Sequence, residues 1–90
     1  MRETLRELIG QEIVVDTRSR WMYIGRLEAV RDDSLQLADA DVHDGSEGTL
    51  TKERYVLSSC ETGIKANRRR VYVSLDCVVS VSPLAEVIRY

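Results

Sequence analysis

The sequence predicts an all-β protein: a small, strongly bent antiparallel barrel of five strands, SH3-like in class, with an N-terminal α-helix and a helical or loop insertion between the third and fourth strands. Apolar and polar residues alternate along several short runs separated by polar turns. In the run from Met22 to Ala40, a glycine-bent apolar strand leads through an acidic turn into an alternating Leu-Gln-Leu strand. This order is typical of a curved β-hairpin.

The first element is expected to be a short amphipathic helix over about residues 2–9. Leu5, Leu8 and Ile9 recur at helical spacing, which would place them on one face against the barrel. Gly10 follows and suits the left-handed conformation that ends many helices.

Alternation then places the strands at about 11–17, 21–31, 34–43, 69–75 and 77–82. Gly25 divides the second of them. Before Gly25, alternation makes Met22 and Ile24 the residues that face inward. After it, Leu27 and Ala29 are the residues that face inward. Such a change of parity requires a bulge or a tight bend, and glycine accommodates both.

Residues 45–67 form the expected insertion between the third and fourth strands. It begins as a glycine-containing loop, and from residue 49 to 61 the alternation is lost while apolar residues recur at roughly helical intervals. Gly63 suits a C-terminal cap. Both a surface helix and an irregular excursion fit this segment.

Composition indicates one globular domain over residues 1–90, since hydrophobic residues make up 43% and charged residues 31% of the chain. No apolar run approaches the length of a membrane span and no signal peptide is recognisable, so we expect a cytoplasmic protein. A domain of this size is often marginally stable alone, and oligomerisation is one expected support. Cys60 and Cys77 lie far apart, without metal-binding spacing, and are expected to be free, buried thiols.

No catalytic group, metal site or cofactor site is expected. His43 is the only histidine, and no Cys, Ser or metal-ligand spacing surrounds it. The carboxylates of Asp39, Asp41 and Asp44 are expected to be solvated at a strand end rather than to hold a cation. We therefore expect a binding protein and not an enzyme.

The hairpin resembles the first Sm motif of the Sm-like (LSm) family, a Gly-x-Leu strand followed by a polar turn and an Asn-Leu-x-Leu-x-Asp-Ala strand. Here these elements are Gly25-Arg26-Leu27 and Ser34-Leu35-Gln36-Leu37-Ala38-Asp39-Ala40. The resemblance covers about residues 5–42 and weakens afterwards. The family's second motif, usually Ile-Arg-Gly-Asp/Asn, is Val73-Ser74-Leu75-Asp76, in which only the aspartate matches well. The chain thus looks like an Sm-like protein that diverges in the second Sm motif.

The resemblance implies a homo-oligomeric ring, from pentamer to heptamer, in which the fourth strand of one subunit pairs with the fifth strand of the next. The subunit contact then falls on Val71, Val73, Leu75, Val78, Val79 and Val81. These runs are nearly free of the charges that usually guard an exposed edge.

The resemblance also implies binding of single-stranded, U- or A-rich RNA at the turns before the third and fifth strands. Carried over by position, the contacts are Asp33, Ser34, Ser74 and Asp76. The base pocket is non-standard, because the family's Arg and Gly are replaced here. The run Arg68, Arg69 and Arg70 is a second candidate for phosphate contact, since guanidinium groups bind phosphate in bidentate fashion.

A self-assembling small-barrel scaffold that recognises another protein, without RNA, is the alternative. The net charge of −2 and the missing Arg-Gly pair favour it, because nucleic-acid-binding domains usually carry a basic excess. In that case the arginine run is a solvated strand end or contacts an acidic turn of a neighbouring subunit. Salt dependence separates the two functions, because phosphate contacts release counterions.

Overall fold

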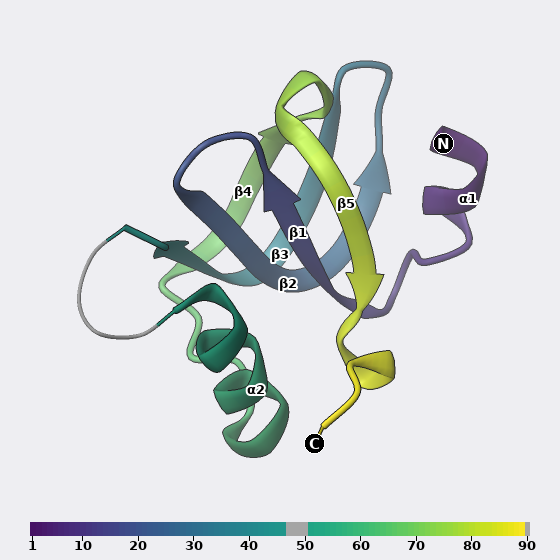
Figure 1. Ribbon diagram of the computed structural model, residues 1–90. Coiled ribbons are helices and arrows are strands. Elements are labelled where there is room, and N and C mark those ends of the chain that lie inside the picture. Colours follow the sequence, from purple (N-terminus) through teal and green to yellow (C-terminus); the bar gives the residue numbers. More distant parts are fainter. Residues whose placement is uncertain (47–50, 90) are drawn as a thin grey trace.

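The computed structural model describes residues 1–46 and 51–89, in which five antiparallel strands form one bent sheet in the order β4-β3-β2-β1-β5 (Figure 1). The strands are β1 (Glu12–Thr17), β2 (Trp21–Val30), β3 (Ser34–Asp44), β4 (Arg68–Ser74) and β5 (Val78–Pro83). The helices are α1 (Arg2–Arg6) and α2 (Lys52–Thr62), with single 3-10 turns η1 (Leu75–Cys77) and η2 (Leu84–Glu86). The predicted all-β barrel with an N-terminal helix is confirmed.

A β-bulge at Gly25 bends the central hairpin, as the sequence predicts. Asp39 and Ala40 of β3 both lie opposite this single residue of β2. Asp39 takes the left-handed backbone conformation, with φ of 48°. A Cβ atom on Gly25 would lie 2.8 Å from the Cβ of Ala40, so only glycine allows the two strands to approach this closely.

Buried side chains form two clusters, one inside the barrel and one between the outer face of the sheet and α2. The barrel cluster contains Leu5, Ile13, Val15, Leu27, Leu35, Leu37, Ala40, Val73 and Val78. The outer cluster contains Val14, Met22, Ile24, Tyr55 and Leu84. Both faces of β1 and of the first half of β2 are therefore covered.

This arrangement corrects the predicted parity of β2. Met22 and Ile24 do not face the barrel interior but pack in the outer cluster under α2, while Tyr23 packs against the barrel cluster. Ala29 belongs to neither cluster. The parity changes in β3, where the bulge brings both Leu37 and Ala40 into the barrel. It also changes in β2, but at the register shift after Leu27, so that Leu27 and Val30 both pack inward.

The N-terminal helix is shorter than predicted, because it ends at Arg6 rather than near residue 9. Tighter turns continue to Gly10, whose φ of 94° agrees with the predicted left-handed conformation and whose N–H donates to the carbonyl of Leu27. This hydrogen bond joins the chain to β2. Ile9 is 46% exposed, so it does not belong to the apolar helix face that the sequence predicts.

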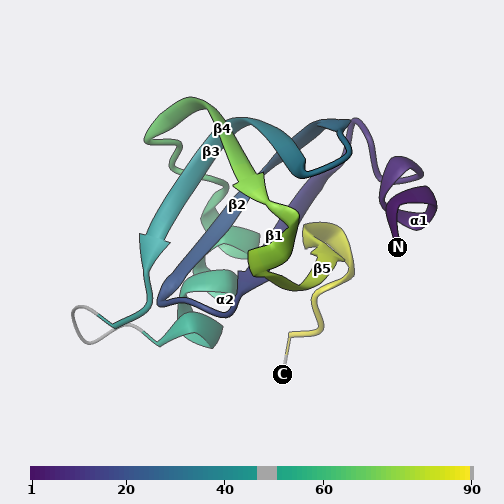
Figure 2. The same cartoon turned by 90° about the horizontal axis from the view of Figure 1, so that it is seen from above.

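The insertion contains a helix, α2, although residues 47–50 of the predicted excursion lie outside the described part of the chain. The Thr51 hydroxyl caps its first turn by accepting from the N–H of Arg54 at 3.2 Å, and Gly63 follows its last residue with φ of 85°. Figures 1 and 2 show α2 packed on one side of the barrel and α1 at the far end. In residues 1–46 and 51–89, no helix is both long and apolar enough to cross a membrane.

The two cysteines differ from the prediction of buried thiols. Cys60 is half-buried in α2, and Cys77 is exposed. Cys77 is exposed because the last strand begins one residue later than predicted, at Val78, so that the thiol lies in η1 and not in the sheet.

Tyr55 joins α2 to the barrel wall. Its ring stacks on His43 of β3 with 3.9 Å between centroids and 9° between planes. The Tyr55 hydroxyl and His43 Nε2 are buried and have no hydrogen-bond partner among the described residues. Burial raises the pKa of the Tyr55 phenol well above its ordinary value, and the Asp41 carboxylate raises it further, so the phenol stays protonated.

We expect Tyr55→Phe to leave the free energy of unfolding unchanged or to raise it by about 1 kcal/mol, because it keeps the stacked ring and removes an unsatisfied buried donor. Tyr55→Ala is expected to lower the same quantity by about 3–5 kcal/mol, through loss of the ring from the outer cluster. Urea denaturation of both variants measures these differences. A clear loss in Tyr55→Phe would mean that the hydroxyl bonds to a neighbour such as Asp41.

Candidate nucleic-acid interface

The β2–β3 turn and the β4–β5 turn lie side by side at one end of the barrel (Figure 1). The backbone N–H of Leu75 donates to the carbonyl of Asp33 at 2.9 Å, and Ser34 is the register partner of Ser74. Asp76 follows within η1. The four residues that the sequence assigns to a base pocket therefore come from two segments that adjoin in the fold.

The four side chains that the sequence assigns to these turns are two carboxylates and two hydroxyl groups. Asp33, Ser74 and Asp76 are exposed, and Ser34 is half-buried. Carboxylates accept hydrogen bonds and repel phosphate, whereas hydroxyl groups both donate and accept. Within the described residues, no group of three or more His, Cys, Asp or Glu side chains is arranged to hold a metal ion.

Two arginines that the sequence does not assign to this site approach it from other elements. Arg18, in the β1–β2 turn, donates its backbone N–H to the carbonyl of Cys77 at 2.9 Å and so flanks η1. Arg2 of α1 donates from its guanidinium to the carbonyl of Asp32 at 2.9 Å. The positions of these two arginines follow only from the pairing of β1 with β5 and from the position of α1. Nothing local in the sequence relates Arg18 to the β4–β5 turn.

The basic run Arg68, Arg69 and Arg70 lies at the opposite end of β4 from Ser74. A strand rises ~3.3 Å per residue, so the start of β4 is roughly 20 Å from the turns. Arg70 is partly engaged, because its Nε lies 3.5 Å from the Glu28 carboxylate. A Gln36 hydrogen bond and this guanidinium hold the pKa of Glu28 below its ordinary value. The arginine run and the turns thus form two separate surfaces.

Both ends of the five-stranded sheet are open in the described chain, because β4 pairs only with β3 and β5 pairs only with β1. Of the six residues predicted at a subunit contact, Val73 and Val78 belong to the barrel cluster, and three others pack against it: Val71, Leu75 and Val81. Val79 alone projects largely into solvent, 60% exposed. Tyr72 of β4, 58% exposed, is a large apolar residue at the edge that the sequence analysis does not single out.

Comparison with known proteins identifies the architecture. No protein-family model and no curated protein matches the chain. Among solved structures, it is similar to an Sm protein of Pyrococcus abyssii in complex with a uridine heptamer, with TM-score 0.62 and 16% identity over 90% of this chain and 93% of that one. A heptameric archaeal Sm protein gives TM-score 0.56 and 20% identity, covering 90% and 96% of the two chains.

A chain of the NatC complex bound to Gag peptide and CoA is also similar, with TM-score 0.54 and 19% identity over 86% of each chain. At such identities a likeness establishes the fold and not the partner. The fold implied by the Gly-x-Leu and Leu-x-Leu-x-Asp-Ala segments is confirmed: this chain has the Sm-like fold.

Proposed function

We propose that this chain assembles with copies of itself into a closed ring and binds single-stranded, U- or A-rich RNA at the β2–β3 and β4–β5 turns, as a binding protein rather than an enzyme. The observation that supports this most is the contact between the two turns, through the Leu75 to Asp33 hydrogen bond. The Sm protein in complex with a uridine heptamer and the heptameric Sm protein, both similar in fold, support the same function.

The two open edges support ring closure. Pairing β4 of one copy with β5 of the next is a head-to-tail contact, which repeats until the rotation closes. The apolar, uncharged stretch from Val71 to Leu75 carries none of the lysines that natural proteins place on edges to prevent pairing. We infer a ring of five to seven subunits.

The residues of the turns suit the recognition of bases. Uracil and adenine both present an N–H on their Watson–Crick edge, and the carboxylates of Asp33 and Asp76 accept from such groups. The hydroxyl groups of Ser34 and Ser74 donate or accept beside them. Arg18 supplies the cation for the phosphate, a role that the second motif of this chain no longer fills.

Arg18→Glu is expected to weaken binding of oligouridine or oligoadenine about tenfold, because a charge-assisted contact is replaced by a repulsion. The slope of log affinity against log salt should fall by about 0.7, the share of one phosphate contact on a single strand. Fluorescence anisotropy at several salt concentrations measures both, with light scattering to check that the ring mass is unchanged.

Arg69→Glu is the matched control, since it makes the same charge change at the other end of β4. Retained affinity in this variant together with a loss in Arg18→Glu assigns the RNA to the turns. Loss of affinity in the control, with affinity retained in Arg18→Glu, would assign the RNA to the arginine run instead. If the unmodified protein binds neither oligonucleotide, the RNA function is wrong.

The second candidate function is a self-assembling scaffold that recognises another protein. The net charge of −2, the exposed carboxylates at the turns and the similar chain within the NatC complex favour it. An intact ring without RNA affinity is the result that supports this function. The cytoplasmic location expected from the sequence stays a prediction in both cases.

A further inference from the structure

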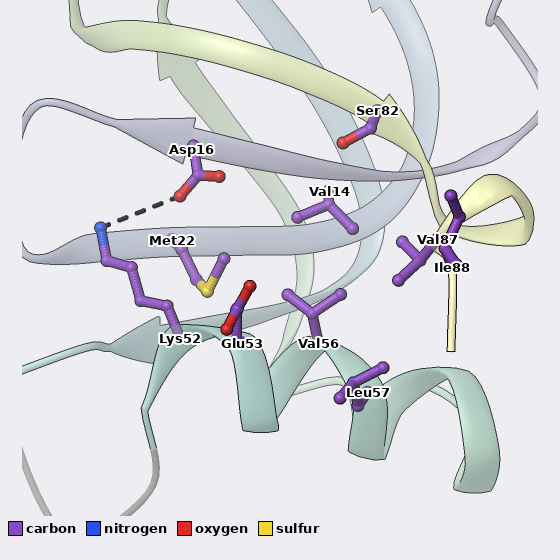
Figure 3. Close-up of a pocket in the computed structure, with 10 residues that line it drawn as sticks. All are labelled: Val14, Asp16, Met22, Lys52, Glu53, Val56, Leu57, Ser82, Val87 and Ile88. Carbon is purple, nitrogen blue, oxygen red and sulfur yellow. Dashed lines mark ion pairs between the residues drawn. The ribbon is translucent and has the colours of Figure 1, made fainter. Parts of the chain in front are cut away.

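A groove of about 250 Å³ lies between α2, the outer face of β1 and the C-terminal segment 84–89 (Figure 3). Its floor and walls are apolar and include Val14, Val56 and Val87. The ammonium of Lys52 lies 3.9 Å from the Asp16 carboxylate and closes one end, as Figure 3 shows. The groove therefore suits an apolar group, with the Lys52–Asp16 ion pair at one end.

One wall of this groove belongs to the open edge of the sheet. Ser82 of β5 lines the groove and is the register partner of Val14 in β1. Within the described residues β5 has no strand on its other side. A strand added there would extend the outer face of the sheet directly beside the groove, because side chains alternate between the two faces of a sheet.

The strand that the proposed ring adds at this edge is β4 of the next copy. In β4, Val71 and Val73 pack into their own barrel, so the intervening Tyr72 projects from the outer face. Tyr72 is 58% exposed in the single chain. The exposed Tyr72 side chain and the groove therefore both lie on the outer face of the sheet that the ring would form across β4 and β5.

Charge supports the same pairing. Arg70 shares the outer face of β4 with Tyr72, and Arg68 stands at the start of the same strand. In antiparallel addition, the start of the incoming β4 lies beside the end of β5. Glu86 follows Pro83 at that end, and Glu12 precedes Ile13, the register partner of Pro83. The arginines of one copy thus approach carboxylates of the other, which favours this partner and orientation.

We propose that the Tyr72 ring of each subunit inserts into the groove beneath α2 of its neighbour, so that the insertion between β3 and β4 completes the subunit contact. This inference rests on the ring proposed above and adds to it a specific occupant for the groove. A partly buried aromatic anchor in an apolar pocket is the typical centre of a protein interface.

The direct test replaces Tyr72 with the photo-crosslinking residue p-benzoylphenylalanine, which keeps an aromatic side chain at this position. Irradiation of the assembled protein is expected to give adducts between chains, mapped by mass spectrometry to residues 52–57 and 87–88. The same residue at the position of Ile9, exposed but on neither edge, is expected to give no such adduct.

A second measurement uses the strength of assembly. Tyr72→Ala is expected to raise the concentration at which the ring dissociates at least about tenfold, and Tyr72→Phe is expected to leave it unchanged. An assembled protein without adducts in the groove, or a Tyr72→Ala variant that assembles as tightly as the parent, overturns the insertion while the ring stands. An unmodified protein that is monomeric overturns the ring itself.

Discussion

Val81→Lys is expected to convert the assembled protein into folded monomers. Val81 lies on the edge strand β5 and packs, half-buried, against the barrel cluster. An inward-pointing charge on an edge strand blocks pairing, because the ammonium reaches water at an open edge but is buried without a partner once another strand covers it. Light scattering measures the mass, and circular dichroism with urea denaturation verifies the fold.

Ile9→Lys is the matched control for this experiment. Ile9 is 46% exposed and lies in the turn after α1, in neither β4 nor β5. The Ile9→Lys substitution adds the same charge outside the edge strands, so the ring of this variant should have the mass of the parent ring. If Val81→Lys assembles as the parent does at micromolar concentration, the edges of β4 and β5 are not the subunit contact.

Gly25→Val is expected to lower the free energy of unfolding by about 3 kcal/mol, at the upper end of the usual cost of overpacking. Its Cβ would lie 2.8 Å from the Cβ and 3.0 Å from the Cα of Ala40. A backbone atom at this distance cannot move aside as a flexible side chain does, so the bulge itself must open. In a small domain this is a large share of the total stability. Thermal and urea denaturation measure the loss.

The double variant Gly25→Ala with Ala40→Gly tests the stated cause. Gly25→Ala alone should be destabilising, and the second substitution should restore part of the loss, because it removes the Cβ that Gly25→Ala approaches. If the two effects simply add, the clash with Ala40 is not the reason for glycine at this position.

Sequence patterns predict the elements of this protein well, because each pattern reports a local property. Alternation identifies the five strands to within about a residue at each end, and the neighbours of Gly25 indicate the bend. Lost alternation and the glycine after residue 62 left a helix and an irregular loop both open for the insertion, and the structure shows the helix. Periodicity reports which residues share a face, but it does not report what covers that face. For this reason the packing of Met22 and Ile24 under α2 escapes the prediction.

The candidate site divides in the same way. The sequence by itself determined the residues of the two turns and the near absence of charge in residues 71–75 and 78–81 of the prospective edges. Only the tertiary structure decided that Arg18 flanks η1, that the arginine run lies at the far end of β4, and that Tyr72 projects from the open edge. These facts depend on which distant strands pair and on how the barrel bends. Long-range register and packing decide both, and no short segment of the chain encodes them.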